Sequence, residues 1–288
     1  SFFTRLNYNF DSRYFAEFIL RADGSSKFGP SNRWGYFPAI GLAWNIARES
    51  FLAEQNKLSS LKLRLNYGIT GNQSGIDEYA IFGLWKGGYG YADIVGGEEK
   101  PGTAPLQLKN PDLKWESTTQ FNAGLDFGFL KDKITFEINY YEKYTKDALL
   151  LVGTAGTTGY QSYITNYGEI SNKGFEFAVN AHLVSKDKFS WSSNLNLAQN
   201  KNRIEDIPAD IPFAGRDLIR LQKGHSLYSY WLYNQIGVNS ETGDVIYEDV
   251  NDDKAITVAD RKIIGDTWPK LFGGFTNIEA GNKAKGLQ

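Results

Sequence analysis

The feature that most constrains this chain is a strict alternation of apolar and polar residues. In residues 61–70, LKLRLNYGIT, three leucines, Tyr67 and Ile69 occupy the odd positions, whereas Lys62, Arg64 and Asn66 occupy even ones. Successive side chains of a β-strand point to opposite faces, so the segment predicts a strand between one apolar and one polar environment. The apolar environment is a protein core in a soluble sandwich, and lipid in an outer-membrane barrel whose polar face lines a wet lumen.

The same pattern recurs along the chain and predicts about ten strands. The clearest examples lie at residues 6–10, 14–20, 121–127, 134–140, 175–183 and 191–197. Acidic residues such as Glu17 and Glu137 fall on the polar faces, which argues against a protein core there. Tight polar turns at 11–13, 131–133 and 186–188 alternate with long connections, as in an outer-membrane barrel. Residues 47–60 look like a longer turn on the short-turn side, holding a helical turn.

Composition and motifs exclude several function classes. The chain has no cysteine, which removes disulfides, thiolate nucleophiles and cysteine-based zinc sites. A formal net charge of −2 gives no general attraction for nucleic acid, so no nucleic-acid partner is expected. The segment GHSLY at 224–228 begins like a nucleophile elbow, but Tyr228 stands where the closing glycine belongs. No other catalytic motif is present, and we expect no enzyme.

Three stretches resemble one family of proteins. They are LRADGSSKFGPSNRWGYFPAIGLAWNI at 20–46, LKLRLNYGITGNQ at 61–73, and GDVIYEDVNDDKAITVADRKIIGDTWPKLFGGFTN at 243–277. Together they resemble the barrel of SusC-type TonB-dependent transporters of the Gram-negative outer membrane. Residues 110–150 and 170–181 fit the strands that lie between these stretches in the family's order.

The resemblance implies an all-β fold: an antiparallel transmembrane sector of a 22-stranded barrel, with short periplasmic turns and long extracellular loops. Residues 1–288 are then part of one TonB-dependent β-barrel domain, and the plug domain and final strands are expected to be absent from this sequence. The implied function is import of a glycan or peptide across the cell outer membrane. The implied partners are a SusD-like surface lipoprotein, the TonB complex acting through the plug, outer-membrane lipid, and an oligosaccharide or peptide substrate.

Two other functions remain open from the sequence. A soluble or surface-anchored carbohydrate-binding β-domain would need the apolar faces to pack against each other. A siderophore-type TonB-dependent receptor would share the barrel, but the DGSS, RWG and TGNQ segments point away from it.

The glycine-rich segment WKGGYGYAD at 85–93 is the candidate substrate-binding loop. Trp85, Tyr89 and Tyr91 could stack on sugar faces, while the glycines let backbone approach a ligand. Packing of these rings against a neighbouring loop or a lid protein is the alternative, and we favour it because buried aromatic rings gain more free energy than exposed ones.

The segment DVNDDKAITVAD at 249–260 is a candidate calcium loop with a structural role. The predicted ligands follow the spacing of a twelve-residue calcium loop and are Asp249, Asn251, Asp253, Ala255 through its carbonyl, Thr257 and Asp260. Lys254 stands where such loops carry glycine, so it must adopt a strained conformation or abandon the turn. The alternative is an Asp/Asn-rich turn capped by its own side chains.

The segment RADGSSKFGPSNRWG at 21–35 predicts a structured extracellular loop. Its Asp-Gly and Gly-Pro pairs favour turns. We expect Arg33 to pair with a carboxylate and Trp34 to lie at the membrane interface.

Overall fold

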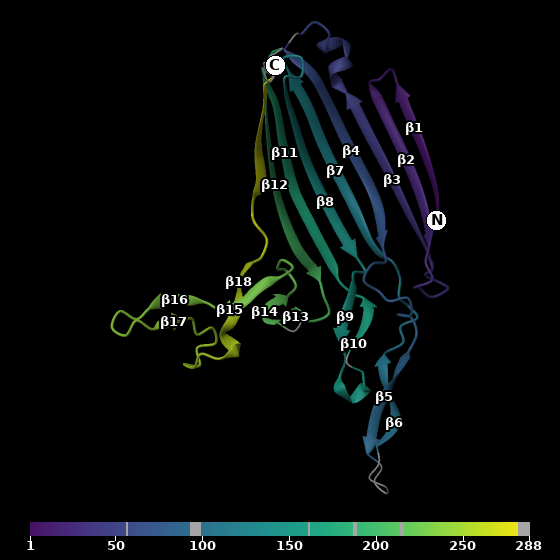
Figure 1. Ribbon diagram of the computed structural model, residues 1–288, viewed down its shortest axis with the longest axis vertical. Coiled ribbons are helices and arrows are strands. Elements are labelled where there is room, and N and C mark those ends of the chain that lie inside the picture. The colour runs from purple at the N-terminus through teal and green to yellow at the C-terminus, as the bar shows by residue number, and fades with distance from the viewer. Residues whose placement is uncertain (56, 93–98, 161, 187–188, 214–215, 282–288) are drawn as a thin grey trace, which may run out of the picture.

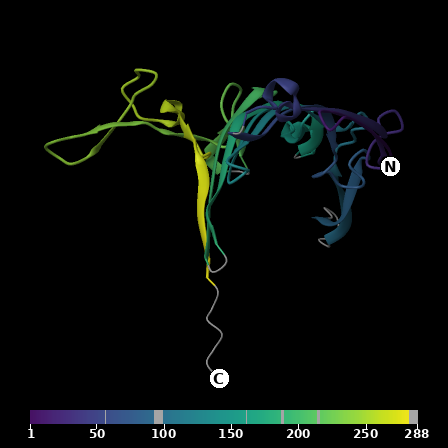
Figure 2. The ribbon, with the colours of Figure 1, turned by 90° about the horizontal axis from the view of Figure 1, so that it is seen from above.

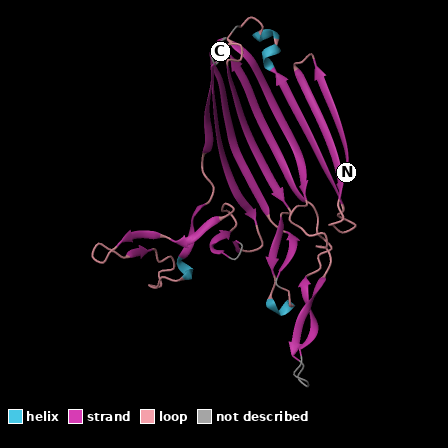
Figure 3. Ribbon diagram, viewed as in Figure 1, coloured by secondary structure: helices cyan, strands magenta, loops and turns pink. Residues whose placement is uncertain are grey.

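The computed structural model describes residues 1–55, 57–92, 99–160, 162–186, 189–213 and 216–281. Its main element is one nine-stranded antiparallel sheet, shown in Figures 1 and 3. In spatial order the strands are β1 (Phe2–Phe10), β2 (Tyr14–Gly24), β3 (Trp34–Asn45), β4 (Leu58–Asn72), β7 (Glu116–Phe129), β8 (Ile134–Lys146), β11 (Glu169–Lys186), β12 (Phe189–Asp206) and β19 (Phe272–Gly281). Seen from above, the sheet follows an arc and does not close (Figure 2). The predicted all-β sector is confirmed.

The strand register places the apolar residues of neighbouring strands in continuous rows. Phe18 pairs with Ile40, Ile40 with Tyr67, and Tyr67 with Phe121, so one row crosses four strands. All four side chains are exposed, and no second sheet covers this face among the described residues. A soluble sandwich would bury such a face, so the arrangement favours lipid as its neighbour.

Short connections join the strands at one end of the sheet. The segment after β3 forms two short 3-10 helices, η1 (Ile46–Arg48) and η2 (Ser50–Leu52), which confirms the helical turn expected there. Between them, the buried carboxylate of Glu49 accepts hydrogen bonds from the Tyr14 hydroxyl (2.6 Å) and the Trp44 indole (2.9 Å). These bonds hold the connection against β2 and β3, and they lower the pKa of Glu49.

Long connections at the other end form small sheets of their own. They comprise the hairpin β5 (Leu84–Ala92) with β6 (Glu99–Gln107), the hairpin β9 (Leu149–Gly153) with β10 (Ser162–Asn166), a four-stranded sheet of β13 (Ile211–Phe213), β14 (Arg216–Leu221), β15 (Ser229–Tyr233) and β18 (Arg261–Asp266), and the hairpin β16 (Gln235–Val238) with β17 (Val245–Tyr247). Two further 3-10 helices are η3 (Gly156–Thr158) and η4 (Val258–Asp260). The described residues contain no helix long and apolar enough to cross a membrane.

Candidate functional site: the polar face and the loop end of the sheet

The polar face of the sheet carries a charged network that joins three strands. Arg64 on β4 binds Asp126 on β7 through its Nε atom (2.7 Å) and one terminal nitrogen (2.5 Å). The same terminal nitrogen donates to Asn139 on β8 (3.0 Å). Gly124 makes room for this network, because a Cβ there would lie 2.8 Å from the Arg64 guanidinium carbon.

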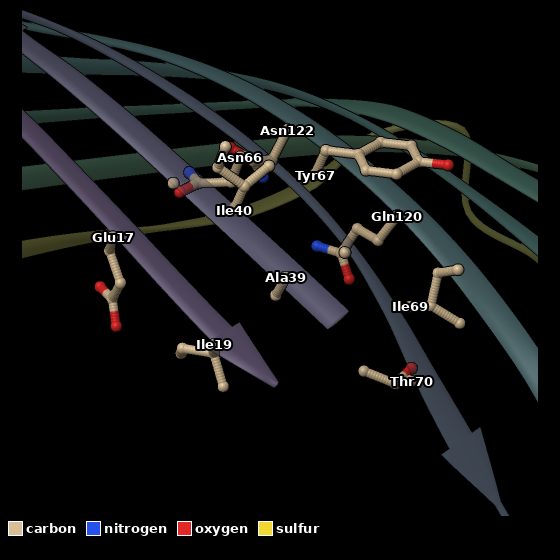
Figure 4. Close-up of a pocket in the computed structure, with 12 residues that line it drawn as sticks. Glu17, Ile19, Ala39, Ile40, Asn66, Tyr67, Ile69, Thr70, Gln120 and Asn122 are labelled. Carbon is tan, nitrogen blue, oxygen red and sulfur yellow. The ribbon is translucent and has the colours of Figure 1, made fainter. Parts of the chain in front are cut away.

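Nearer the loop end, the polar face is hollowed because several of its residues are small. Figure 4 shows this pocket, with Glu17, Asn66 and Asn122 around Ala39. Gly41 lies on β3 and pairs with Asn66 of β4, and a Cβ added to it would come within 2.9 Å of the Asn66 side-chain oxygen. Polar side chains around a shallow hollow suit a hydrated lumen wall, as the sequence predicted for the even-numbered residues of β4.

Asparagine side chains continue the polar face across β11 and β12. Asn202 donates to Asn172 (2.9 Å), and Asn200 accepts from the Tyr141 hydroxyl (3.0 Å). Asn180 and Asn194 are also hydrogen-bonded to each other across the two strands. These hydrogen bonds between uncharged side chains hold the polar face of β11 and β12 in place without adding charge to it.

The DGSSKFG segment forms a small core at the loop end of the sheet. Phe28 and Leu113 are fully buried there together with Ile76 and Ala80. The ring of Phe28 lies 5.0 Å from that of Trp115. Residues of β9 and β10 pack against the same core, so it connects four segments of the chain.

Polar contacts complete this core. Lys27 donates from Nζ to the backbone carbonyl of Ile76 (2.8 Å). A Cβ at Gly29 would lie 2.5 Å from the carbonyl oxygen of Pro111, so only glycine fits there. The loop 21–35 is therefore structured, as predicted. The expected carboxylate partner of Arg33 is not found among the described residues, and the ion pair of this loop joins Arg21 to Asp23. Trp34 begins β3, where its exposed ring stacks on Phe2.

The three predicted substrate-binding aromatic residues all lie on β5, in the hairpin that projects from the loop end (Figure 1). Trp85 pairs with Pro105 of β6 and is 64% exposed, so it is available for a ligand or for a partner surface. The side chains of Tyr89 and Tyr91 lie outside what the structure describes. Substrate binding by these residues stays a prediction.

The first half of the predicted calcium loop forms a turn capped by its own side chains. The Asp249 carboxylate accepts the backbone N–H groups of Asp253 (3.3 Å) and Lys254 (2.7 Å). The Asp253 carboxylate accepts from the backbone of Ala255 and from the Asn251 amide, each at 2.8 Å. Lys254 has a φ of +68°, so it keeps the left-handed turn that glycine would favour at this position.

The second half of the loop is organised around Asp260. This side chain is fully buried, and its two oxygens accept the backbone N–H groups of Val250 (2.9 Å) and Thr257 (2.7 Å). These bonds lower the pKa of Asp260 below its usual range, with the Thr257 bond the largest cause. Among the described residues, no group of three or more His, Asp or Glu is arranged to hold a metal ion. Calcium binding here stays a prediction.

Sequence comparison decides the family. The family model for the β-barrel of TonB-dependent-receptor-like proteins matches residues 1–278. The chain belongs to this family. Its SusC-like character is also supported, because it is 36% identical to the TonB-dependent receptor SusC of Bacteroides thetaiotaomicron over 292 residues, covering 96% of this chain and 29% of SusC. It is 33% identical to TonB-dependent receptor P3 of Formosa agariphila, covering 96% of this chain and 30% of that receptor.

Solved structures agree with this family assignment. A structure of the RagAB peptide transporter matches with a TM-score of 0.85 and 25% identity, covering 97% of this chain and 31% of the matched chain. The chain thus spans about a third or less of the length of the relatives it matches. The alternating strands and the two-faced sheet agree with membership of this barrel family.

The contacts that join distant strands leave no signal in the local sequence pattern. Arg64 and Asp126 lie 62 residues apart, and Phe28 and Leu113 lie 85 apart (113 − 28). Alternation put Arg64 and Asp126 on polar faces, which was a usable signal. Alternation does not specify which strands are neighbours in the sheet, and the neighbouring strand decides which residue pairs with Arg64.

Proposed function

We propose that the complete protein is an outer-membrane transporter that imports a glycan or peptide nutrient in a TonB-dependent manner. Residues 1–288 form part of its barrel domain, with the apolar face against lipid and the polar face toward the lumen. The similarity to SusC over 96% of the chain is the main support. The exposed apolar rows and the hydrogen-bonded polar face agree with this orientation.

The partners follow from the same proposal. A SusD-like lipoprotein would cover the loop end, and the TonB complex would act through a plug domain inside the lumen. The match to a RagAB peptide transporter favours a peptide substrate, and the match to SusC leaves a glycan open. Exposed Trp85 on the projecting β5–β6 hairpin is available to such a lid or substrate.

The test uses the complete gene in its own bacterium. Purification of the tagged protein in detergent, followed by mass spectrometry, should recover a lipoprotein in stoichiometric amount. Deletion of the gene should abolish growth on one oligosaccharide or peptide source, and removal of TonB should give the same defect. Growth that is unchanged on every source, with no lipoprotein recovered, contradicts the proposal.

We also propose that residues 249–260 bind calcium in a structural role. The left-handed conformation of Lys254 supports it, because a twelve-residue calcium loop makes its sharp turn at this position. Calorimetric titration of calcium should give a Kd of about 0.1–1 mM, in the range of extracellular loops. Lys254→Gly should tighten binding by removing the cation from the turn. An absence of binding to both forms identifies a turn that is only self-capped.

A further inference from the structure

A cavity of about 420 Å³ opens where β12 and β19 separate at the loop end of the sheet. The ladder between these strands ends at the pair Ala198–Phe272. Beyond it β12 continues to Asp206, while the chain enters β19 from β18 along a separate path (Figure 1). Gly224 and His225 close the far end by hydrogen bonds to the backbone of Ile204, each 2.8 Å long.

The lining of this cavity is rich in positive charge. Its basic residues are Lys201, Arg203, His225 and Lys270. Asp266 is the only carboxylate among the described lining residues, and its Oδ1 atom already accepts the backbone N–H of Trp268 (3.0 Å). Neither lysine forms an ion pair within the described part of the chain, and Arg203 has only a long contact (3.5 Å) to Glu205. The chain as a whole carries a net charge of −2, so this positive patch is local.

Backbone donors face the same cavity. Ile204 bonds to the 224–225 segment through both its N–H and its carbonyl. Residues of an antiparallel strand direct these groups to alternate edges, so Asn200 and Asn202 present theirs to the cavity edge as well. The N–H groups of Asn200 and Asn202, beside two lysines and an arginine, are suited to bind the oxygens of an anion, while the carbonyls of the same two residues face the same edge and can accept from sugar hydroxyls.

An aromatic ring forms one wall. Trp268 is 41% exposed, and its indole N–H donates to the carbonyl of Leu227 (3.2 Å), which fixes the ring. A fixed, partly exposed aromatic face can pack against the C–H face of a sugar ring. We propose that this cavity binds an acidic saccharide, a sugar carrying a carboxylate, sulfate or phosphate, with the acid group on Lys201, Arg203 and Lys270 and the ring on Trp268.

Two kinds of molecule could supply the acidic sugar. Lys201 and Arg203 share the alternation of Leu195 and Leu197, so they point to the same side as the apolar face. Acidic sugars of lipopolysaccharide in the outer leaflet could therefore reach the cavity, and so could a soluble acidic oligosaccharide. The cavity can bind a saccharide whether or not the protein transports it. Binding can therefore be measured even if the proposed transport function is wrong.

The experiment uses the complete protein purified in detergent and the double variant Lys201→Gln/Lys270→Gln. The matched control is Lys131→Gln/Lys133→Gln, which removes the same charge from the turn between β7 and β8 at the opposite end of the sheet. Calorimetry with trigalacturonate, maltotriose and triglutamate gives affinities, and mass spectrometry of the purified protein gives bound lipopolysaccharide. Thermal unfolding checks that each variant remains folded.

We expect the unmodified protein to bind trigalacturonate, and to bind maltotriose at least tenfold more weakly. The Lys201→Gln/Lys270→Gln variant should lose at least tenfold in affinity for trigalacturonate, whereas the control variant should keep its affinity. Trp268→Ala should weaken trigalacturonate with the charges intact. Loss of bound lipopolysaccharide in the cavity variant identifies the lipid as the source, whereas unchanged lipopolysaccharide identifies a soluble saccharide. Triglutamate binding as tight as trigalacturonate overturns the saccharide assignment, and equal behaviour of the cavity and control variants overturns the site.

Discussion

At the scale of single residues, the Arg64–Asp126 pair ties β4 to β7 on the polar face. Both side chains are about 30% exposed, so screening by water limits the free energy of the pair. We predict a coupling free energy of about 1 kcal/mol in a double-mutant cycle of Arg64→Met and Asp126→Asn. Denaturant unfolding of the complete protein in detergent measures it. Strictly additive effects of the two substitutions would show that the pair contributes nothing to stability.

The buried Asp260 carboxylate predicts a pH dependence of the loop around it. Its pKa is lower in the folded loop than in an unfolded chain, where it is about 4. A group of this kind stabilises the fold above its unfolded pKa, and that contribution is lost as the pH falls through the folded pKa. The protection of amide hydrogens in residues 249–260, measured against the intrinsic exchange rate at each pH, should therefore fall below about pH 4.

Asp260→Asn should remove most of this pH dependence, because the amide cannot ionise. Asp252→Asn is the matched control, since Asp252 is exposed and lies in the same turn. If the Asp260→Asn loop kept the same pH dependence, another group would have to be responsible.

At the scale of elements, the two faces of β4 should respond differently to the same charge. Leu65 lies on the apolar face and Asn66 on the polar face. Leu65→Arg should cost about 2–4 kcal/mol near the membrane midplane and reduce assembly in the outer membrane. Asn66→Arg adds the same side chain to the lumen side and should assemble normally. Heat-modifiable gel mobility of membrane fractions compares the two, and equal assembly of both variants contradicts the proposed orientation.

The small core at the loop end should control the segments that pack in it, which are residues 73–83 and the β9–β10 hairpin. Phe28 is fully buried, so Phe28→Ala should cost about 3–5 kcal/mol of local stability. Hydrogen exchange should quicken in residues 149–160 and 73–83, while the nine-stranded sheet stays protected. Phe82→Ala removes an exposed ring from the same region and serves as the control. Unchanged protection of both segments in Phe28→Ala would show that Phe28 does not anchor them.

At the scale of the whole molecule, the nine-stranded sheet has two edges, β1 and β19, with no partner strand among the described residues. Unpaired backbone at membrane depth is costly, and exposed edges pair with other chains. A polypeptide of residues 1–288 alone should therefore aggregate, whereas the complete protein should give a stable species in detergent. Size-exclusion chromatography of both tests this prediction. A monodisperse, folded 1–288 fragment would contradict it.

Much of the fold could be predicted because alternation is a local property. Period-two patterns at residues 61–70 and 134–140 identified strands and their two faces, and the tight turns at 11–13 and 131–133 identified one end of the sheet. The strand at 272–281 has a weaker pattern, yet it pairs with β12, more than 60 residues earlier. Neighbours so far apart in sequence leave no local signal, because a strand's pattern specifies its faces and not its partner.

The candidate sites also divide into features that local sequence determines and features that only the tertiary structure decides. The sequence by itself determined that residues 249–260 contain an Asp/Asn-rich turn and that Lys254 stands where this turn needs a left-handed residue, since both depend on spacing within one segment. Only the tertiary structure decided that Phe28 is the centre of a core, and that Lys201 and Lys270 line one cavity. Side-chain alternation is set by the backbone of a single strand, whereas cavities and cores arise from segments that the fold brings together from distant parts of the chain.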